Sequence, residues 1–377
     1  MKFIHLSIAF ISISLVLHAQ DKNVTIGDYE LKIKETVAVG PVKDQGTTGT
    51  CWSFATTSFI EAEIMRITKQ DVDLSEMYFV RNAYEEKADN YVRMHGKGNF
   101  SPGGQAHDVM HVIEKSGMVP ESVYPGRAYG YNEHNHHELN NVLTYFTDGV
   151  VKSSPNRLTT VWPIALNGIL DAYLGKEISN FTFKDKTYSP ETFADEMKIH
   201  PADYVELTTY NHMPFYAPFV LKVPDNWSFN EYYNLPLDVF METINHALDN
   251  GFSICWDGDV SDKWFSHKDG LAISPTEEAA KGTPLQSPAE EKNITQTDRQ
   301  SAYNSHAVTD DHLMHITGYA RGKDGTIYYQ VKNSWGTTSN SLEGYLYMSE
   351  PYFRLGTIAV MVHKNAIPDA TREKLGL

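Results

Sequence analysis

Hydrophobic residues recur with helical spacing in the segment VKDQGTTGTCWSFATTSFIEAEIMR, Val42 to Arg66. The apolar positions follow one another at steps of three and four residues, as Trp52, Ala55, Phe59, Ala62 and Met65. This spacing is typical of an amphipathic helix. Because the stripe begins directly after Gly49 and Thr50, it predicts a helix whose first turn carries Cys51.

A second pattern, alternating and rich in β-branched and aromatic residues, occupies residues 310–336, DDHLMHITGYARGKDGTIYYQVKNSWG. Two strand-like runs flank the turn-like RGKDG, which predicts a hairpin. If Ala320 faces Gly325 across a four-residue loop, His312 lies opposite Asn333 on one face of the sheet. His315 would then oppose Gln330 on the other face. The pattern therefore predicts that the His312 imidazole and the Asn333 amide are neighbours.

The remaining pattern predicts an exported protein with a helix-rich and a β-rich part. Residues 1–19 combine a basic start, a short apolar stretch and a small-residue exit, which predicts a signal peptide and a periplasmic or secreted location. A membrane anchor is disfavoured because the apolar stretch is too short to span a bilayer. We expect a short N-terminal arm over residues 20–40 and a helix-rich part over 41–250, with an inserted helical segment over about 126–230. A β-rich part follows over 251–377.

Composition narrows the function classes. The chain has 377 residues, of which 41% are apolar, so it can bury a large core. Its 32 basic and 48 acidic residues give a formal net charge of −16, and no basic run is present that could neutralise phosphates. Nucleic acid is therefore not an expected partner.

The two cysteines have different surroundings. Cys255 lies in GFSICWDG, an apolar run bounded by glycines, and is predicted to be a buried structural thiol. Cys51 lies at a predicted helix start, where unpaired N–H groups and the helix dipole favour a thiolate. A thiolate nucleophile needs a base and a group that orients the base. His312 and Asn333 are the candidates for these two roles.

DQGTTGTCWSFA resembles the active-site segment of the papain-like cysteine peptidases, and NSWG resembles the segment that carries their orienting asparagine. The resemblance implies a two-part α+β fold with the active-site cleft between the helix-rich and β-rich parts. It also implies that Cys51 is the nucleophile, His312 the base and acid, and Asn333 the orienter. Gln45 would donate to the oxyanion, and Trp335 would lie at the site and shield the His–Asn contact from water.

Several further segments resemble the bleomycin hydrolase and aminopeptidase C branch of that superfamily: SPGGQAHDVMHVIEKSGMVPESVYP, YNLPLDVFMETINHALDNGFSICWDGDVSDKW and DHLMHITG. Thr48 stands where many papain relatives have a cysteine, three residues before the nucleophile, which also favours this branch. The resemblance implies that Gly103 and Gly104 offer backbone groups to a peptide substrate. It further implies an aminopeptidase without a cofactor, assembled as a homo-oligomer.

Alternatives remain open at the sequence level. In that branch a long C-terminal tail brings its carboxylate to the substrate's amino terminus, whereas KNAIPDATREKLGL ends soon after a short predicted helix. A papain-like endopeptidase with an open cleft is therefore the first alternative. A Cys–His amidase or acyltransferase and an inactive peptide-binding relative are less favoured.

One histidine-rich segment raises the question of a metal. NEHNHHELNN, residues 132–141, lacks the spacing of a zinc peptidase helix, so we expect a solvated loop that leads into a helix and no metal site.

Overall fold

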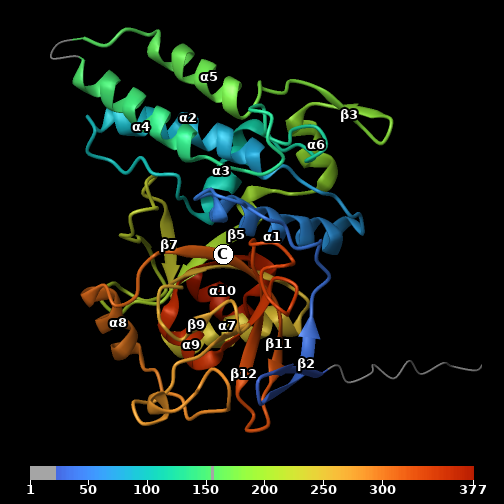
Figure 1. The fold of residues 1–377 in the computed structure, drawn as a ribbon, viewed down its shortest axis with the longest axis vertical. Helices are drawn as coiled ribbons and strands as arrows, with labels where there is room; N and C mark the ends of the chain where they lie inside the picture. Colours follow the sequence, from blue (N-terminus) through green and yellow to red (C-terminus); the bar gives the residue numbers. More distant parts are fainter. Residues whose placement is uncertain (1–22, 154–156) are drawn as a thin grey trace, which may run out of the picture.

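The structure is a computed structural model that describes residues 23–153 and 157–377. The predicted signal peptide lies outside these described ranges. Ordered elements run through both ranges, and one half of the molecule is mainly helical while the other contains the main sheet and the helices that pack on it (Figure 1). The α+β class predicted from the sequence is therefore confirmed.

One half of the molecule is built mainly from helices. In Figure 1, α2 to α6 gather in this half, and α1 lies at its junction with the other half. The elements are α1 (Cys51–Thr68), α2 (Glu76–Arg93), α3 (Ala106–Ser116), α4 (His137–Lys152), α5 (Trp162–Tyr173), α6 (Pro190–Met197), and the small hairpin of β3 (Phe181–Phe183) and β4 (Lys186–Tyr188).

The other half contains the main sheet. Its path joins β6 (Pro218–Val220), β7 (Glu231–Asn234), β5 (Tyr204–Thr208), β14 (Thr357–His363), β8 (Ile254–Gly258), β11 (His312–Arg321), β12 (Ile327–Lys332), β13 (Tyr345–Ser349), β10 (Leu271–Ala272) and β9 (Phe265–Ser266). The N-terminal hairpin of β1 (Asn23–Ile26) and β2 (Tyr29–Thr36) joins this sheet where β2 pairs with β11. The helices of this half are α7 (Leu237–Asp249), α8 (Gln296–Ser305), α9 (Glu350–Gly356) and α10 (Asp369–Leu375).

The two faces of the sheet bury different cores, because successive side chains of a strand point to opposite faces. Cys255 on β8 and Leu313 on β11 belong to the core shared with α1 and the helical half. Their neighbours Trp256 and Met314 belong to the core shared with α7. α1 is thus enclosed between the sheet and the other helices, and it is buried without interruption from Trp52 to Ile64. The apolar residues that predicted α1 therefore form only one side of a helix that is buried on all sides over these residues.

Three predicted segments differ from the structure. Residues 204–234, most of which were expected in a helical insertion, contain β5, β6 and β7, which extend the main sheet beyond β14. The short N-terminal arm predicted over residues 20–40, for which no strand was expected, contains the hairpin of β1 and β2. α7 falls within the predicted helix-rich part but packs on the sheet. Short apolar runs do not reveal their pairing partners, which here are distant in sequence.

The predicted hairpin is present, but its register is different. Ala320 pairs with Tyr328, three residues beyond the expected Gly325, and His315 pairs with Lys332, two residues beyond the expected Gln330. The difference from the predicted pairing falls from three residues to two because a bulge lies between Ile316 and Gly318. An even offset leaves each residue on its predicted face. The bulge therefore preserves the shared face of His312 and Asn333 although the turn was placed wrongly.

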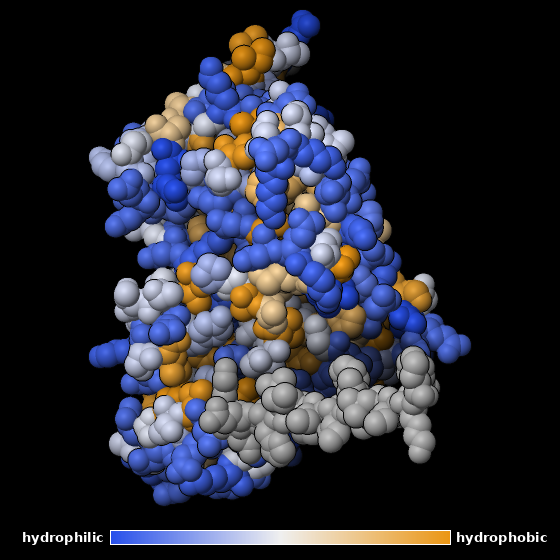
Figure 2. Space-filling model, turned by 90° about the vertical axis from the view of Figure 1, so that its right-hand side faces the viewer, coloured by the Kyte–Doolittle hydropathy of each residue, from blue (hydrophilic) through white to orange (hydrophobic). Residues whose placement is uncertain are grey.

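No helix within residues 23–153 and 157–377 is long and apolar enough to cross a bilayer. On the face shown in Figure 2, hydrophilic residues predominate and hydrophobic residues form scattered spots.

Candidate active site

Cys51 is the first residue of α1, as the sequence predicts. Thr50, which precedes it, makes no side-chain cap, and its carbonyl accepts from the Ser53 and Phe54 N–H groups of the first turn. Cys51 is partly exposed, and the backbone N–H of Leu313 on β11 donates to its sulfur. Burial raises the pKa of the Cys51 thiol to about 12, while the Leu313 N–H acts in the opposite direction. The site thus combines donors that favour a thiolate with an enclosure that disfavours it.

His312 and Asn333 are in direct contact. The His312 Nε2 atom lies 2.8 Å from Asn333 Oδ1, and both residues are buried. Since Asn333 Oδ1 can only accept, His312 carries a hydrogen on Nε2, which leaves Nδ1 as its basic nitrogen. Trp335 covers the pair, with its ring centroid 4.9 Å from that of His312. Burial lowers the pKa of His312 to about 4, so the free imidazole is neutral near pH 7.

His267 completes this arrangement and was missed in the sequence. Asn333 Nδ2 donates to His267 Nδ1 at 3.2 Å, and His267 Nε2 lies 2.8 Å from Ser339 Oγ. Burial lowers the pKa of His267, which keeps Nδ1 able to accept. Together these bonds fix which end of the Asn333 amide faces His312. The segment FSHKDG offers no signal for this role, because it lies 66 residues from Asn333.

Gln45 is held against the strand end that carries Asn333. Its backbone N–H donates to the Ser334 carbonyl at 2.8 Å, and its Oε1 accepts from Ser334 Oγ at 2.6 Å. One N–H of its side-chain amide donates to the Thr48 carbonyl at 2.9 Å. The amide nitrogen has a second N–H. Gln45 is thereby fixed at the start of the loop that leads to Cys51.

Gly103 and Gly104 lie where side chains could not be accommodated. A Cβ atom on Gly104 would come within 3.0 Å of the Trp52 ring and 2.6 Å of Asp108 Oδ2. A Cβ atom on Gly103 would lie 1.9 Å from Asp225 Oδ2. The backbone at these two positions is therefore packed tightly against α1 on one side and the segment around Asp225 on the other.

The histidine-rich segment leads into α4, as predicted, but the expectation that it is solvated is wrong for two of its histidines. His134 and His136 are buried, and burial lowers the pKa of each to about 4. The Thr47 backbone bonds to both, through the His134 carbonyl at 2.8 Å and the His136 N–H at 3.0 Å. These contacts support the loop before Cys51. Within the described residues, no group of three or more His, Cys, Asp or Glu side chains could hold a metal ion.

Two other residues weighed in the sequence are inside the core. Cys255 is a buried free thiol 3.5 Å from Thr56 Oγ1, which confirms its predicted burial. His315 is fully buried, and its Nδ1 lies 2.9 Å from Ser58 Oγ on α1. It therefore faces away from the His312–Asn333 contact.

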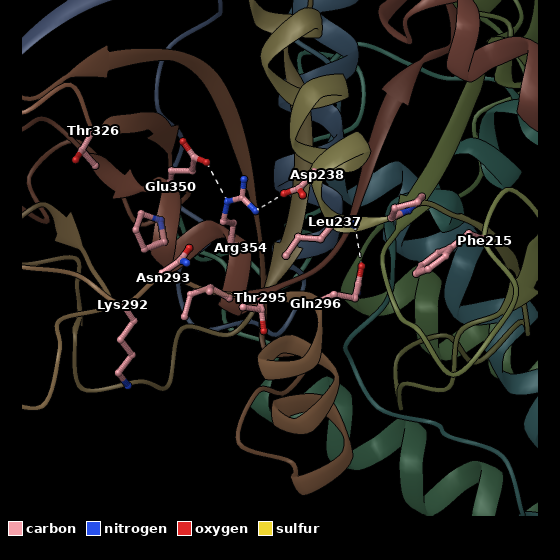
Figure 3. Close-up of a pocket in the computed structure, with 13 residues that line it drawn as sticks. Phe215, Leu237, Asp238, Lys292, Asn293, Thr295, Gln296, Thr326, Glu350 and Arg354 are labelled. Carbon is pink, nitrogen blue, oxygen red and sulfur yellow. Dashed lines mark hydrogen bonds and ion pairs between the residues drawn. The ribbon is translucent and has the colours of Figure 1, made fainter.

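A surface pocket of about 650 Å³ lies elsewhere, between α7, α9 and the start of α8 (Figure 3). Its polar groups are paired with one another: Arg354 bonds to Asp238 at 3.0 Å and to Glu350 at 2.9 Å, and the Leu237 N–H donates to Gln296 at 2.8 Å. None of the predicted site residues lines this pocket.

Comparisons with known proteins agree on one superfamily. The model described as "Peptidase C1-like family" matches residues 173–376, and the model described as "Papain family cysteine protease" matches residues 29–192. Aminopeptidase C from Lactobacillus helveticus is 22% identical over 88% of this chain and 81% of its own length. Bleomycin hydrolase from Mus musculus is 22% identical over 87% of this chain and 81% of its own length. Among solved structures, PepW from Lactobacillus rhamnosis HN001 superposes with a TM-score of 0.72 at 20% identity, covering 91% of this chain and 84% of that chain.

Proposed function

The chain belongs to the Peptidase C1-like family and is a cysteine peptidase, and we propose from this premise that Cys51, His312, Asn333 and Gln45 carry out its chemistry. The observation that carries the proposal is the meeting of two elements. Cys51 at the start of α1 accepts the N–H of Leu313, the residue next to His312, while His312 is bonded to Asn333. The nucleophile and a held imidazole thus come from different halves of the molecule.

The geometry assigns the direction of proton transfer. As the Cys51 sulfur attacks the substrate carbonyl carbon, the thiol proton moves to His312 Nδ1, because Nε2–H is engaged by Asn333. The oxyanion that forms accepts from the free N–H of the Gln45 amide and from the Cys51 backbone N–H. His312 then gives its proton to the leaving amine. Water attacks the thioester, again losing its proton to His312, and the acid product leaves with the thiol restored.

We further propose that the protein is an aminopeptidase acting on peptide substrates. This rests on the similarity to aminopeptidase C and bleomycin hydrolase over 87–88% of the chain. Leu377 packs against the core on the α7 face of the sheet, whereas Cys51 lies on the α1 face. An endopeptidase with an open cleft is the competing proposal.

The test of mode compares leucyl-aminomethylcoumarin with its N-acetylated form. An aminopeptidase is expected to prefer the free amine by at least about tenfold in kcat/KM, since one charge-assisted bond contributes about 1.5–3 kcal/mol. Deletion of Gly376 and Leu377 should leave this preference unchanged, because Leu377 lies on the other face of the sheet. Equal rates for the two substrates would instead support the endopeptidase.

Location and assembly are further proposals from the sequence. We expect export after removal of residues 1–19, which mass spectrometry of the mature amino terminus would test. A homo-oligomer is proposed from the family resemblance, and light scattering coupled to size exclusion would measure its mass.

A further inference from the structure

Three carboxylates lie beside Cys51 and play no part in the chemistry above. Asp225 lies in the segment between β6 and β7, Asp257 on β8 and Asp310 two residues before His312. We refer to them as the acidic cluster. Each of the three raises the pKa of the Cys51 thiol through its charge, so all three act at the nucleophile.

The cluster is arranged by specific contacts. Gln105 Nε2 lies 3.1 Å from each carboxylate oxygen of Asp310, and the Asp225 N–H lies 3.4 Å from Asp310 Oδ2. Asp225 Oδ1 accepts from Asn99 at 3.0 Å and from Ser101 at 3.2 Å. Asp310 and Asp225 are therefore joined to each other and to the chain on both sides of Gly103.

Asp257 is the unusual member. It is only 3% exposed, and among the residues that the structure describes neither of its carboxylate oxygens has a hydrogen-bond partner. The Asp310 carboxyl and the Gln105 amide lie near enough to act on the pKa of Asp257 as side-chain hydrogen-bonding groups, although neither meets the geometry of a hydrogen bond to it, so the carboxyl points into the cluster. Asp257 is also the sheet partner of Leu313, whose N–H reaches the Cys51 sulfur. A buried polar group without a partner destabilises the folded state, and a ligand that supplies the partner removes that cost.

The nearby cation, Lys87, acts on one member of the cluster, Asp225. Lys87 is fully buried, and its ammonium donates to the carbonyls of Ser101 and Gly103. Burial and mutual repulsion raise the pKa of Asp257 and of Asp310, the latter to about 7. Other charged or titratable groups that act on the cluster or its neighbours are Asp108 and His107 on α3, Glu206 on β5, Tyr210 and Tyr232. His107 is the member of this set that can carry a positive charge, because Glu206, Asp108 and Asp310 raise its pKa against the effect of burial. Its two ring nitrogens lie 2.8 Å from Glu206 Oε2 and 3.0 Å from Ser228 Oγ, so that charge is held by Glu206 and not by a member of the cluster.

The segment that carries Asp225 is firmly anchored. Trp227 Nε1 donates to Asp108 Oδ2 at 2.9 Å, and Asn90 donates to the Trp227 carbonyl at 3.0 Å. Asn226 is buried and bonds within the same segment, to the Leu221 and Asn230 carbonyls at 2.9 Å each. Asp225 is thus held against Gly103, where the backbone is expected to meet the substrate.

We propose that the acidic cluster binds an ammonium group of the peptide substrate, foremost the α-ammonium of a free amino terminus. An ammonium group has three N–H donors and no acceptor, which complements a site made of carboxylate acceptors. The described residues offer no metal-binding group, and Leu377 lies on the other face of the sheet. This proposal rests on the proposed cysteine peptidase function and names the residues that recognise its substrate.

The test uses four substrates, because an ammonium can come from the amino terminus or from a lysine side chain. Leucyl-aminomethylcoumarin and its acetylated form address the first source. Acetyl-lysyl-leucyl-aminomethylcoumarin and its norleucyl analogue address the second. In Asp257→Asn and Asp310→Asn we expect kcat/KM to fall about 10- to 100-fold for the ammonium-bearing member of at least one pair, mainly through KM, and to change less than about threefold for its neutral partner.

The matched control is Asp369→Asn, the same chemical change at an exposed residue of α10, which should alter none of the four rates. Loss of activity on charged and neutral substrates alike, in a variant that remains folded, would overturn the proposal, as would unchanged rates on all four. If wild type cleaves acetylated and free leucyl substrates equally, the aminopeptidase proposal fails, while the lysyl pair still tests the cluster.

Discussion

The two groups of polar residues beside Cys51 differ in how completely their hydrogen bonds are made. On the His312 side, Asn333 uses both ends of its amide, Oδ1 toward His312 and Nδ2 toward His267. In the acidic cluster, Asp257 is equally buried but has no hydrogen-bond partner among the described residues. A saturated network holds a geometry without a ligand, whereas an unsaturated one gains most when a ligand arrives. The first is suited to positioning a base and the second to recognising a charge.

Removing the nucleophile that both groups serve should have the largest effect. Cys51→Ala is expected to lower kcat/KM by about 10³-fold or more, because the covalent step is lost. Cys255→Ala should retain most activity, since Cys255 is buried in the core and contacts Thr56. Hydrolysis of a leucyl substrate by the two purified variants checks this. Equal loss in both, with both folded, would contradict the assignment of Cys51.

Substitutions in the hydrogen-bonded group of His312, Asn333 and His267 should have the next largest effect on activity. Asn333→Ala should lower kcat roughly 10- to 100-fold, less than the loss of about 10⁴ seen for a charged triad orienter, because Asn333 is neutral.

His267→Ala should cost roughly fivefold in kcat, the equivalent of one hydrogen bond. His267→Gln should recover part of that loss, because glutamine can also accept from Asn333 and donate to Ser339. Failure of glutamine to improve on alanine would mean that His267 does not act through the Asn333 amide.

The pH dependence of Cys51 alkylation tests the state of His312 without a substrate. Because burial lowers the pKa of His312 to about 4, the imidazole is free to take the thiol proton above that pH. In a Cys255→Ala background, the rate with iodoacetamide should be nearly level between about pH 5 and 8 and should fall up to tenfold per unit below about pH 4. A fall centred near pH 6.5 would show that His312 is not held in its buried, neutral state.

The smallest expected effect is a gain in thermal stability when a carboxylate of the acidic cluster is replaced. The folded state raises the pKa of Asp310 to about 7, so this carboxyl costs no stability below its ordinary value near 4 and an increasing amount as the pH rises to about 7. Asp310→Asn should therefore raise Tm by a few degrees at pH 8 and by little at pH 4.5. Asp257→Asn should do the same, because it loses no partner. Calorimetry at the two pH values measures both, and a lower Tm at pH 8 would contradict a strained cluster.

Local patterns were enough to single out Cys51, His312 and Asn333, whereas Gln45 was found only through the family resemblance. The spacing of the apolar residues predicts the helix that begins at Cys51. The alternation of side chains in the hairpin places His312 and Asn333 on one face, even though the predicted turn was wrong. The prediction of a shared face succeeded because the face of a side chain depends only on whether the observed strand pairing differs from the predicted pairing by an even or an odd number of residues. The bulge near Gly318 made that difference even at His315. The neighbours that arrive from distant segments, His267 and the acidic cluster, left no comparable signal.

The sequence by itself determined the periodic elements, the position of Cys51 at a helix start and the motifs that match the family. Only the tertiary structure decided which polar groups are buried together. His134 and His136 became supports for the loop before Cys51, and β5 to β7 joined the sheet. Periodicity is encoded by neighbours a few residues apart, whereas burial and charge coupling depend on contacts between residues such as Asp225 and Asp310, 85 positions apart. The interaction free energy between such residues arises only when folding brings them together in a buried place.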